Sequence, residues 1–136
     1  MTPEARDYLA KAREDLADAR KILAIHLAKP AARSAYYAAF HAGEALIFER
    51  SGKVAKTHSG VRTLLASVLP RTEVDARVLL TFLARAYKFK EIGDYGVGDG
   101  AVVTEDEARD LVGGAARFIA AVSGLIETPP SASTET

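Results

Sequence analysis

Residues 31–50 read AARSAYYAAFHAGEALIFER, and the expected fold follows from this stretch. Apolar residues surround the predicted helix almost completely, so it lacks the hydrophilic side that a surface helix presents. One of its faces carries only small residues, which let a neighbouring helix approach closely: Ala35, Ala38, Ala39, Ala42 and Ala45. A helix of this kind is expected at the centre of a bundle, in contact with several neighbours.

Helical periodicity continues on both sides of this stretch. The further helices are expected at about residues 3–28, 59–68, 72–95 and 104–126. Thr2 is the expected N-cap of the first helix, and Lys29–Pro30 is its expected end. Thr72 is the expected cap of the fourth helix, and Thr104 with Glu107 predicts a capping box at the start of the last one.

The segments between these helices are short, and several glycines and prolines lie in them. Residues 93–100 hold four glycines and are expected to form a loop. Residues 128–136, with two prolines and several Ser and Thr, are typical of a disordered tail. The 26 alanines favour helix over strand. The sequence therefore predicts an all-α protein, an antiparallel bundle of four to five helices, with one domain at residues 1–127.

Composition limits the possible functions. The 136 residues are 49% hydrophobic and 26% charged, and the formal net charge is zero, which argues against a dedicated duplex-DNA binder. The chain has no cysteine, so disulfides, thiolate zinc sites and cysteine nucleophiles are excluded. No apolar run is long enough to span a membrane, and MTPEARDYL lacks the apolar core of a signal peptide, so we expect a cytoplasmic protein.

Four chemically active side chains lie close together on the central helix. At 100° per residue, Arg33, Tyr37, His41 and Glu44 fall within about 80° of one another. In a functional interpretation they line a cleft, where Arg33 binds a phosphate and His41, held by Glu44, moves a proton. In a structural interpretation these groups only bind one another inside the bundle. The sequence leaves both interpretations open.

Two basic segments also suggest contacts to a polyanion. Residues 50–62 carry four basic residues and His58 but no acidic residue. There Lys56, Thr57 and His58 precede a helix, whose free N–H groups can bind anions, although Thr57 can also be a simple N-cap. The second segment lies on the fourth helix and could either contact RNA or form an ordinary exposed side; it comprises Arg85, Tyr87, Lys88 and Lys90.

Other chemistries receive little support. His41 and Glu44 reverse the Glu-x-x-His order of di-iron bundles, so neither a metal nor a cofactor is expected. The glycine-rich segment lacks the lysine and the preceding strand of a phosphate-binding loop.

Three blocks resemble the HEPN family, and in particular its small stand-alone prokaryotic members. They are RSAYYAAFHA at 33–42, KTHSGV at 56–61 and GDY at 93–95, and the resemblance spans most of residues 5–126. It implies a four-to-five-helix bundle, commonly a homodimer, often encoded beside a minimal nucleotidyltransferase as a toxin–antitoxin pair. Many such toxins cleave RNA without metal, through an Arg and a His that are separated by four to six residues and lie late in the chain, at the dimer interface. Tyrosines near that motif are adenylylated in some members, which makes Tyr95 a candidate for modification.

The expected motif does not occur at its late position, because the histidines are His26, His41 and His58. The candidate catalytic residues are therefore Arg33, His41 and His58, with phosphate or RNA contacts from Lys56, Tyr37, Arg85 and Lys90. Two hypotheses follow from the sequence. Either the protein is a toxin that binds and cleaves RNA, or it is a non-catalytic interaction module that serves as a dimeric scaffold for its partner.

Overall fold

The computed structural model describes residues 1–70 and 74–127, and this part of the chain contains helices but no strand. The elements are α1 (Pro3–Ala24), α2 (Ala28–Ser51), α3 (His58–Val68), α4 (Val74–Tyr95), a 3₁₀ turn η1 (Asp99–Ala101) and α5 (Glu105–Glu127). The prediction of an all-α bundle is confirmed. The expected cap Thr72 and the expected tail at residues 128–136 lie outside the described residues.

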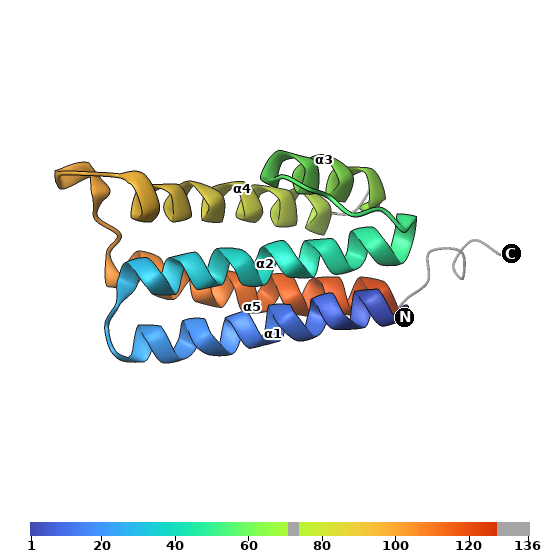
Figure 1. Cartoon of the computed structure of the whole chain (residues 1–136), viewed down its shortest axis with the longest axis horizontal. Coiled ribbons are helices and arrows are strands. Elements are labelled where there is room, and N and C mark those ends of the chain that lie inside the picture. Colours follow the sequence, from blue (N-terminus) through green and yellow to red (C-terminus); the bar gives the residue numbers. More distant parts are fainter. Residues whose placement is uncertain (71–73, 128–136) are drawn as a thin grey trace, which may run out of the picture.

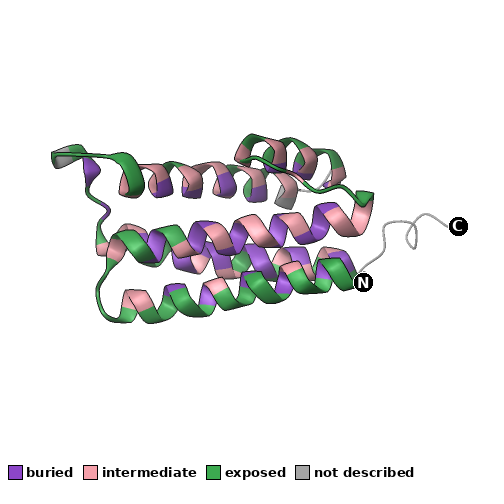
Figure 2. Cartoon of the chain, in the orientation of Figure 1, coloured by how far each residue is buried: buried purple, intermediate pink, exposed green. Residues whose placement is uncertain are grey.

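Helix α2 is the central element, as its apolar surface predicts. It contacts each of the other four α-helices, and Figure 1 shows it between α1 and α4 with α5 behind. All five alanines of the small-residue face are fully buried. Figure 2 shows burial concentrated on α2 and on the inner sides of α1, α4 and α5. Within the described residues no helix has both the length and the hydropathy that a bilayer crossing requires.

Most helix ends follow the local chemistry that the sequence predicts. The hydroxyl of Thr2 accepts a hydrogen bond from the backbone N–H of Ala5, with Pro3 at the first helical position. Thr57 caps α3 in the same way, so this expected N-cap is confirmed. The capping box is confirmed too, because Thr104 and Glu107 each accept a hydrogen bond from the other's backbone N–H.

The expected boundary between the first two helices is wrong. Helix α1 ends at Ala24 rather than near Ala28, and Lys29–Pro30 lie in the first turn of α2. Proline is tolerated there because the N–H groups of a first turn have no partner within the helix. The chain reverses at His26, whose φ of 65° is left-handed. The backbone N–H groups of residues 26 and 27 bond to the carbonyls of residues 23 and 22, the pattern of a Schellman C-cap.

The expected loop at residues 93–100 begins later than its glycines suggested. Helix α4 continues through Gly93 to Tyr95, and only the following residues leave the helix. A Cβ at Gly93 would meet the Lys29 side chain no closer than 3.6 Å, which is ordinary contact. Packing against the start of α2 therefore holds the last turn of α4 despite the low helix propensity of glycine. This last turn places Asp94 beside Arg33 of α2.

Candidate functional site

An open pocket of about 260 Å³ lies between α1 and α2. Its lining combines two cations with hydroxyl, imidazole and carboxyl groups: Lys11 and Asp15 from α1, and Arg33, Ser34, Tyr37 and His41 from α2. The structure therefore brings three of the sequence-predicted residues, Arg33, Tyr37 and His41, to one pocket. Helical spacing explains why, since positions four apart lie one above the other on a helix.

The imidazole of His41 is oriented by a carboxylate. Its Nδ1 lies 2.6 Å from Oε1 of Glu44, one turn further along α2. A carboxylate can only accept, so Nδ1 carries the hydrogen and Nε2 is left as the basic nitrogen of the neutral ring. Both side chains are partly buried, with 16% of the His41 side chain and 11% of the Glu44 side chain exposed. A base held by a second group in this way is the arrangement that proton transfer requires.

A second carboxyl group faces the free nitrogen of His41. Oδ2 of Asp15 lies 3.6 Å from Nε2 of His41. This oxygen is buried and has no hydrogen-bond partner among the described residues. Burial raises the pKa of Asp15, against the opposing influence of His41 and Lys11. The pocket thus presents a basic nitrogen beside a carboxyl group that keeps its proton to a higher pH than usual.

Arg33 lies at the edge of the pocket, close to α4. Its Nε is 3.4 Å from Oδ1 of Asp94, and its guanidinium carbon lies 5.0 Å from the centre of the Tyr37 ring. More than half of the Arg33 side chain, 56%, is exposed. Arg33 therefore has a partner within the bundle and also keeps donors that face solvent, so a phosphate could reach it.

Asp94 also binds Lys90, and for this residue the expectation of an exposed side chain on the fourth helix is wrong. Lys90 is the one buried charged side chain among the described residues, with Nζ 3.1 Å from Asp94 and 3.2 Å from Glu91. Burial lowers the pKa of Lys90, but the hydrogen bonds to Asp94 and Glu91 outweigh it and raise that pKa above its ordinary value. The aromatic rings of Tyr37, Tyr87 and Tyr95 surround the ammonium group within about 6 Å. Lys90 is thus not available to RNA.

His58 belongs to a separate aromatic cluster. Its Nδ1 is hydrogen bonded to the hydroxyl of Tyr36, and its ring packs against those of Phe40 and Tyr87. Burial lowers the pKa of His58, and the nearby positive charge of Lys90 lowers it further. Burial raises the pKa of Tyr36, so both groups stay neutral. His58 does not line the pocket that holds His41.

The other predicted residues lie apart from the pocket. Lys56 is exposed on the loop before α3. Arg85 is paired with Asp110 of α5 at 2.8 Å, which is a solvent-exposed link between helices. Tyr95, the candidate for modification, has 73% of its surface exposed at the end of α4.

Sequence reasoning missed three lining residues: Lys11, Ser34 and Asp15. The available signal for Asp15 was its place beside the buried stripe of α1, one residue before Leu16. Charged residues are frequent along α1, so the pattern does not distinguish Asp15 from the residues that are exposed to solvent. Among the described residues, no group of three or more His, Asp or Glu side chains is placed to hold a metal ion.

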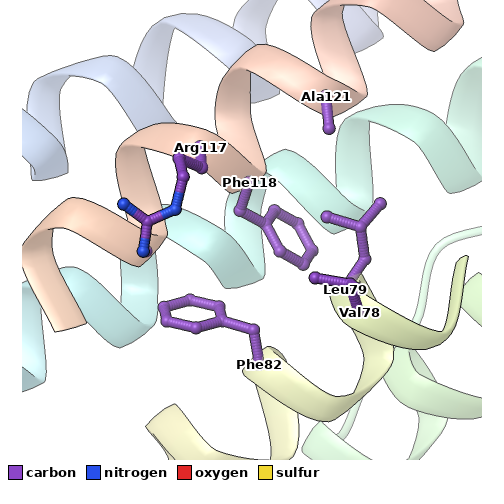
Figure 3. A pocket seen from close by; sticks show the side chains of 7 residues that line it. Val78, Leu79, Phe82, Arg117, Phe118 and Ala121 are labelled. Carbon is purple, nitrogen blue, oxygen red and sulfur yellow. The ribbon is translucent and has the colours of Figure 1, made fainter. Parts of the chain in front are cut away.

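A second pocket, also about 260 Å³, lies between α4 and α5 and is mainly apolar. Figure 3 shows the rings of Phe82 and Phe118 beside each other in its lining, with Arg117 at one side. Phe82 packs directly on the backbone at Gly114, where a Cβ would lie 2.2 Å from the ring. This pocket carries no candidate catalytic group.

Comparison with known proteins supports the resemblance. The HEPN domain model matches residues 5–125. A UPF0332 protein of Thermotoga maritima is 30% identical over 117 residues, which are 86% of this chain and 86% of that protein. The crystal structure of TT1696 from Thermus thermophilus is similar with a TM-score of 0.73 and 28% identity, over 90% of this chain and 98% of that one.

A more distantly related protein has a similar fold. ST0689, described as an archaeal HEPN homologue, aligns with a TM-score of 0.63 and 20% identity, over 92% of this chain and 99% of that one. With the central alanine-rich helix, the bundle and the match over nearly the whole described chain, this chain belongs to the HEPN domain family.

Proposed function

We propose that this protein is the toxin component of a pair with a minimal nucleotidyltransferase antitoxin, and that it binds and cleaves RNA without a metal ion. One observation carries the proposal. Arg33 and a His41 that is held by Glu44 line the same open pocket, so a phosphate binder and an oriented base face one space. The family resemblance supports the partner and the substrate.

Each group in the pocket has a role in this reaction. Arg33 and Lys11 supply positive charge for a phosphate and stabilise the charge that develops on its oxygens. Nε2 of His41 accepts a proton from the attacking hydroxyl group, and Glu44 stabilises the imidazolium that results. The ring of Tyr37 at the pocket wall offers a surface on which a base can stack.

Cleavage of a short RNA in the presence of a chelator tests the proposal. The wild-type chain should cut the RNA, and His41→Asn should reduce the rate by roughly 100-fold or more. His26→Asn is a matched control, because His26 is an exposed histidine bonded to Glu105 outside the pocket. Retention of the wild-type rate by His41→Asn would remove His41 from the mechanism, and His58→Ala then tests the remaining sequence-predicted candidate.

The proposed partnership has its own measurements. Expression of the chain alone should arrest growth, and co-expression of the neighbouring nucleotidyltransferase should relieve the arrest. We also propose that the protein is a homodimer, so sedimentation equilibrium should give twice the chain mass of 14.5 kDa. A single-chain mass at micromolar concentration would contradict the dimer.

A non-catalytic partner-binding scaffold is the second candidate, and a specific observation favours it. Two predicted catalytic groups have partners within the bundle, since Arg33 pairs with Asp94 and His58 is bonded to Tyr36. This alternative predicts stable co-purification with the nucleotidyltransferase, no RNA cleavage and no growth arrest. The cleavage assay therefore separates the two candidates.

A further inference from the structure

Asp15 is placed to act with His41, although it belongs to a different helix. Its Oδ2 lies 3.6 Å from Nε2 of His41, too far for a hydrogen bond, and its side chain, which is 19% exposed, lines the same pocket as His41. The same oxygen is buried and without a hydrogen-bond partner among the described residues. A carboxyl oxygen that is buried without a hydrogen-bond partner from the protein is costly for stability.

The charges around Asp15 come from two helices. Lys11, Glu14 and Asp18 lie near it on α1, and His41 faces it from α2. Burial raises the pKa of the Asp15 carboxyl group, so a larger fraction of the molecules carries its proton at a given pH. Arg33 lines the same pocket and supplies a binding group for a phosphate next to this carboxyl group.

We propose that Asp15 is the proton donor of this pocket and the catalytic partner of His41. The inference rests on the RNA cleavage proposed above and adds the group that protonates the leaving oxygen. It requires the substrate to be a phosphodiester with a neighbouring ribose hydroxyl group, which excludes DNA as a substrate for cleavage.

Two proton transfers accompany the exchange of bonds at phosphorus. Nε2 of His41 takes the proton of the 2′-hydroxyl group while the 2′-oxygen forms a bond to phosphorus. The bond from phosphorus to the 5′-oxygen breaks, its electron pair stays on that oxygen, and the carboxyl group of Asp15 donates a proton to it. The products are a 2′,3′-cyclic phosphate and a 5′-hydroxyl group. The imidazolium of His41 then releases its proton to water and the Asp15 carboxylate takes up a proton from water, which restores both groups.

The pH dependence of cleavage by the full chain tests this role. A proton donor must be protonated, so the wild-type rate should decline on the alkaline side of its profile. Asp15→Asn keeps the shape of the side chain but has no acidic proton, so its rate should fall roughly 100-fold and its alkaline decline should disappear. Asp7→Asn is the matched control, because Asp7 is an exposed aspartate on the same helix and lies outside the pocket.

A second measurement does not depend on catalysis. The carboxyl carbon of Asp15, followed by NMR, should titrate above the ordinary aspartate pKa of 3.8, and the midpoint should rise further in His41→Asn. It rises because the positive imidazolium that favours the Asp15 carboxylate has been removed.

The possible results distinguish the proposed role of Asp15 from the proposed ribonuclease function. An alkaline decline that persists in Asp15→Asn, or an Asp15 titration at the ordinary pKa that does not respond to His41→Asn, overturns the role of Asp15 alone. Absence of cleavage by the wild-type chain contradicts the ribonuclease function itself, and the donor role of Asp15 falls with it.

Discussion

Among single residues, Asp94 contacts both Arg33 at the edge of the pocket and the buried side chain of Lys90. One of its carboxylate oxygens lies 3.4 Å from Nε of Arg33, and the other lies 3.1 Å from Nζ of Lys90. The first contact anchors the guanidinium at the pocket edge. The second compensates a buried positive charge. Asp94 therefore links a group proposed to bind substrate with a group that stabilises the fold.

Replacement of Asp94 tests this link. Asp94→Asn leaves the buried ammonium of Lys90 with Glu91 as its remaining carboxylate partner, so the free energy of unfolding should fall by roughly 1–3 kcal/mol. Urea denaturation measures this change. Asp106→Asn is the control, because its side chain is 93% exposed and pairs with Arg109 at the surface. Equal stability of the two variants would contradict the account of Lys90.

The contacts of the site that lie within one helix could be predicted from the sequence, whereas the contacts between helices could not. Helical spacing alone placed Tyr37 and His41 on one face with Glu44, because these contacts lie within a single helix. The partners from other helices could not be predicted. Asp15 and Asp94 meet α2 only after the bundle has formed, and periodicity does not report which helices face each other. The burial of Lys90 was missed for the same reason.

Between helices, the approach of α4 to α5 depends on one glycine. A Cβ at Gly114 would lie 2.2 Å from the Phe82 ring, so Gly114→Ala must displace that ring. We expect a loss of roughly 1–3 kcal/mol in unfolding free energy, although alanine is the better helix former. Gly124→Ala is the control on the same helix, since a Cβ there meets no atom within 4 Å and should stabilise the protein by up to about 1 kcal/mol. A stabilising Gly114→Ala would refute this packing.

The start of α1 is tied to the end of α2 by a carboxylate. Glu49 accepts a hydrogen bond of 2.8 Å from the backbone N–H of Thr2. This bond lowers the pKa of Glu49 below its ordinary value of 4.5. A carboxylate whose pKa is lowered by folding contributes stability above its unfolded pKa, and that contribution is lost as the pH falls through the folded pKa.

Glu49→Gln should therefore be less stable than the wild type near neutral pH, and the difference should shrink in acid as the wild type loses its own contribution. Thermal or urea unfolding at about pH 7 and about pH 3 measures it. A difference that is the same at both pH values would show that the charge of Glu49 is not responsible.

Most helix ends were predictable because their caps are local. Thr2, Thr57 and the Thr104–Glu107 pair act within one turn of their own helix. The end of α1 was not predictable, because His26 adopts a left-handed conformation that a sequence pattern assigns to glycine or asparagine first. The end of α4 near Tyr95 was predicted, whereas the start of the following loop was placed too early, at Gly93, which still lies in the helix and packs near Lys29.

In the molecule as a whole, the mainly apolar helix α2 contributes residues to both the core and the pocket. The buried alanines of α2 pack against its neighbours, and α2 lies beside α1 (Figure 1). The polar residues Arg33, Tyr37 and His41 of α2 line the pocket between these two helices. The helix that forms the centre of the bundle thus also carries the partly exposed groups that line the pocket. The proposed function depends above all on the binding of RNA at this face.

NMR titration of the labelled chain with a short single-stranded RNA is the sharpest test of this binding. The largest signal changes should fall on the side chains of Arg33, Tyr37 and His41, and they should weaken as salt is added because phosphates provide the attraction. Arg33→Ala should weaken binding, whereas Arg109→Ala, on α5 and paired with Glu105, should not. Signal changes centred elsewhere, or none at saturating RNA, would contradict the proposed RNA site.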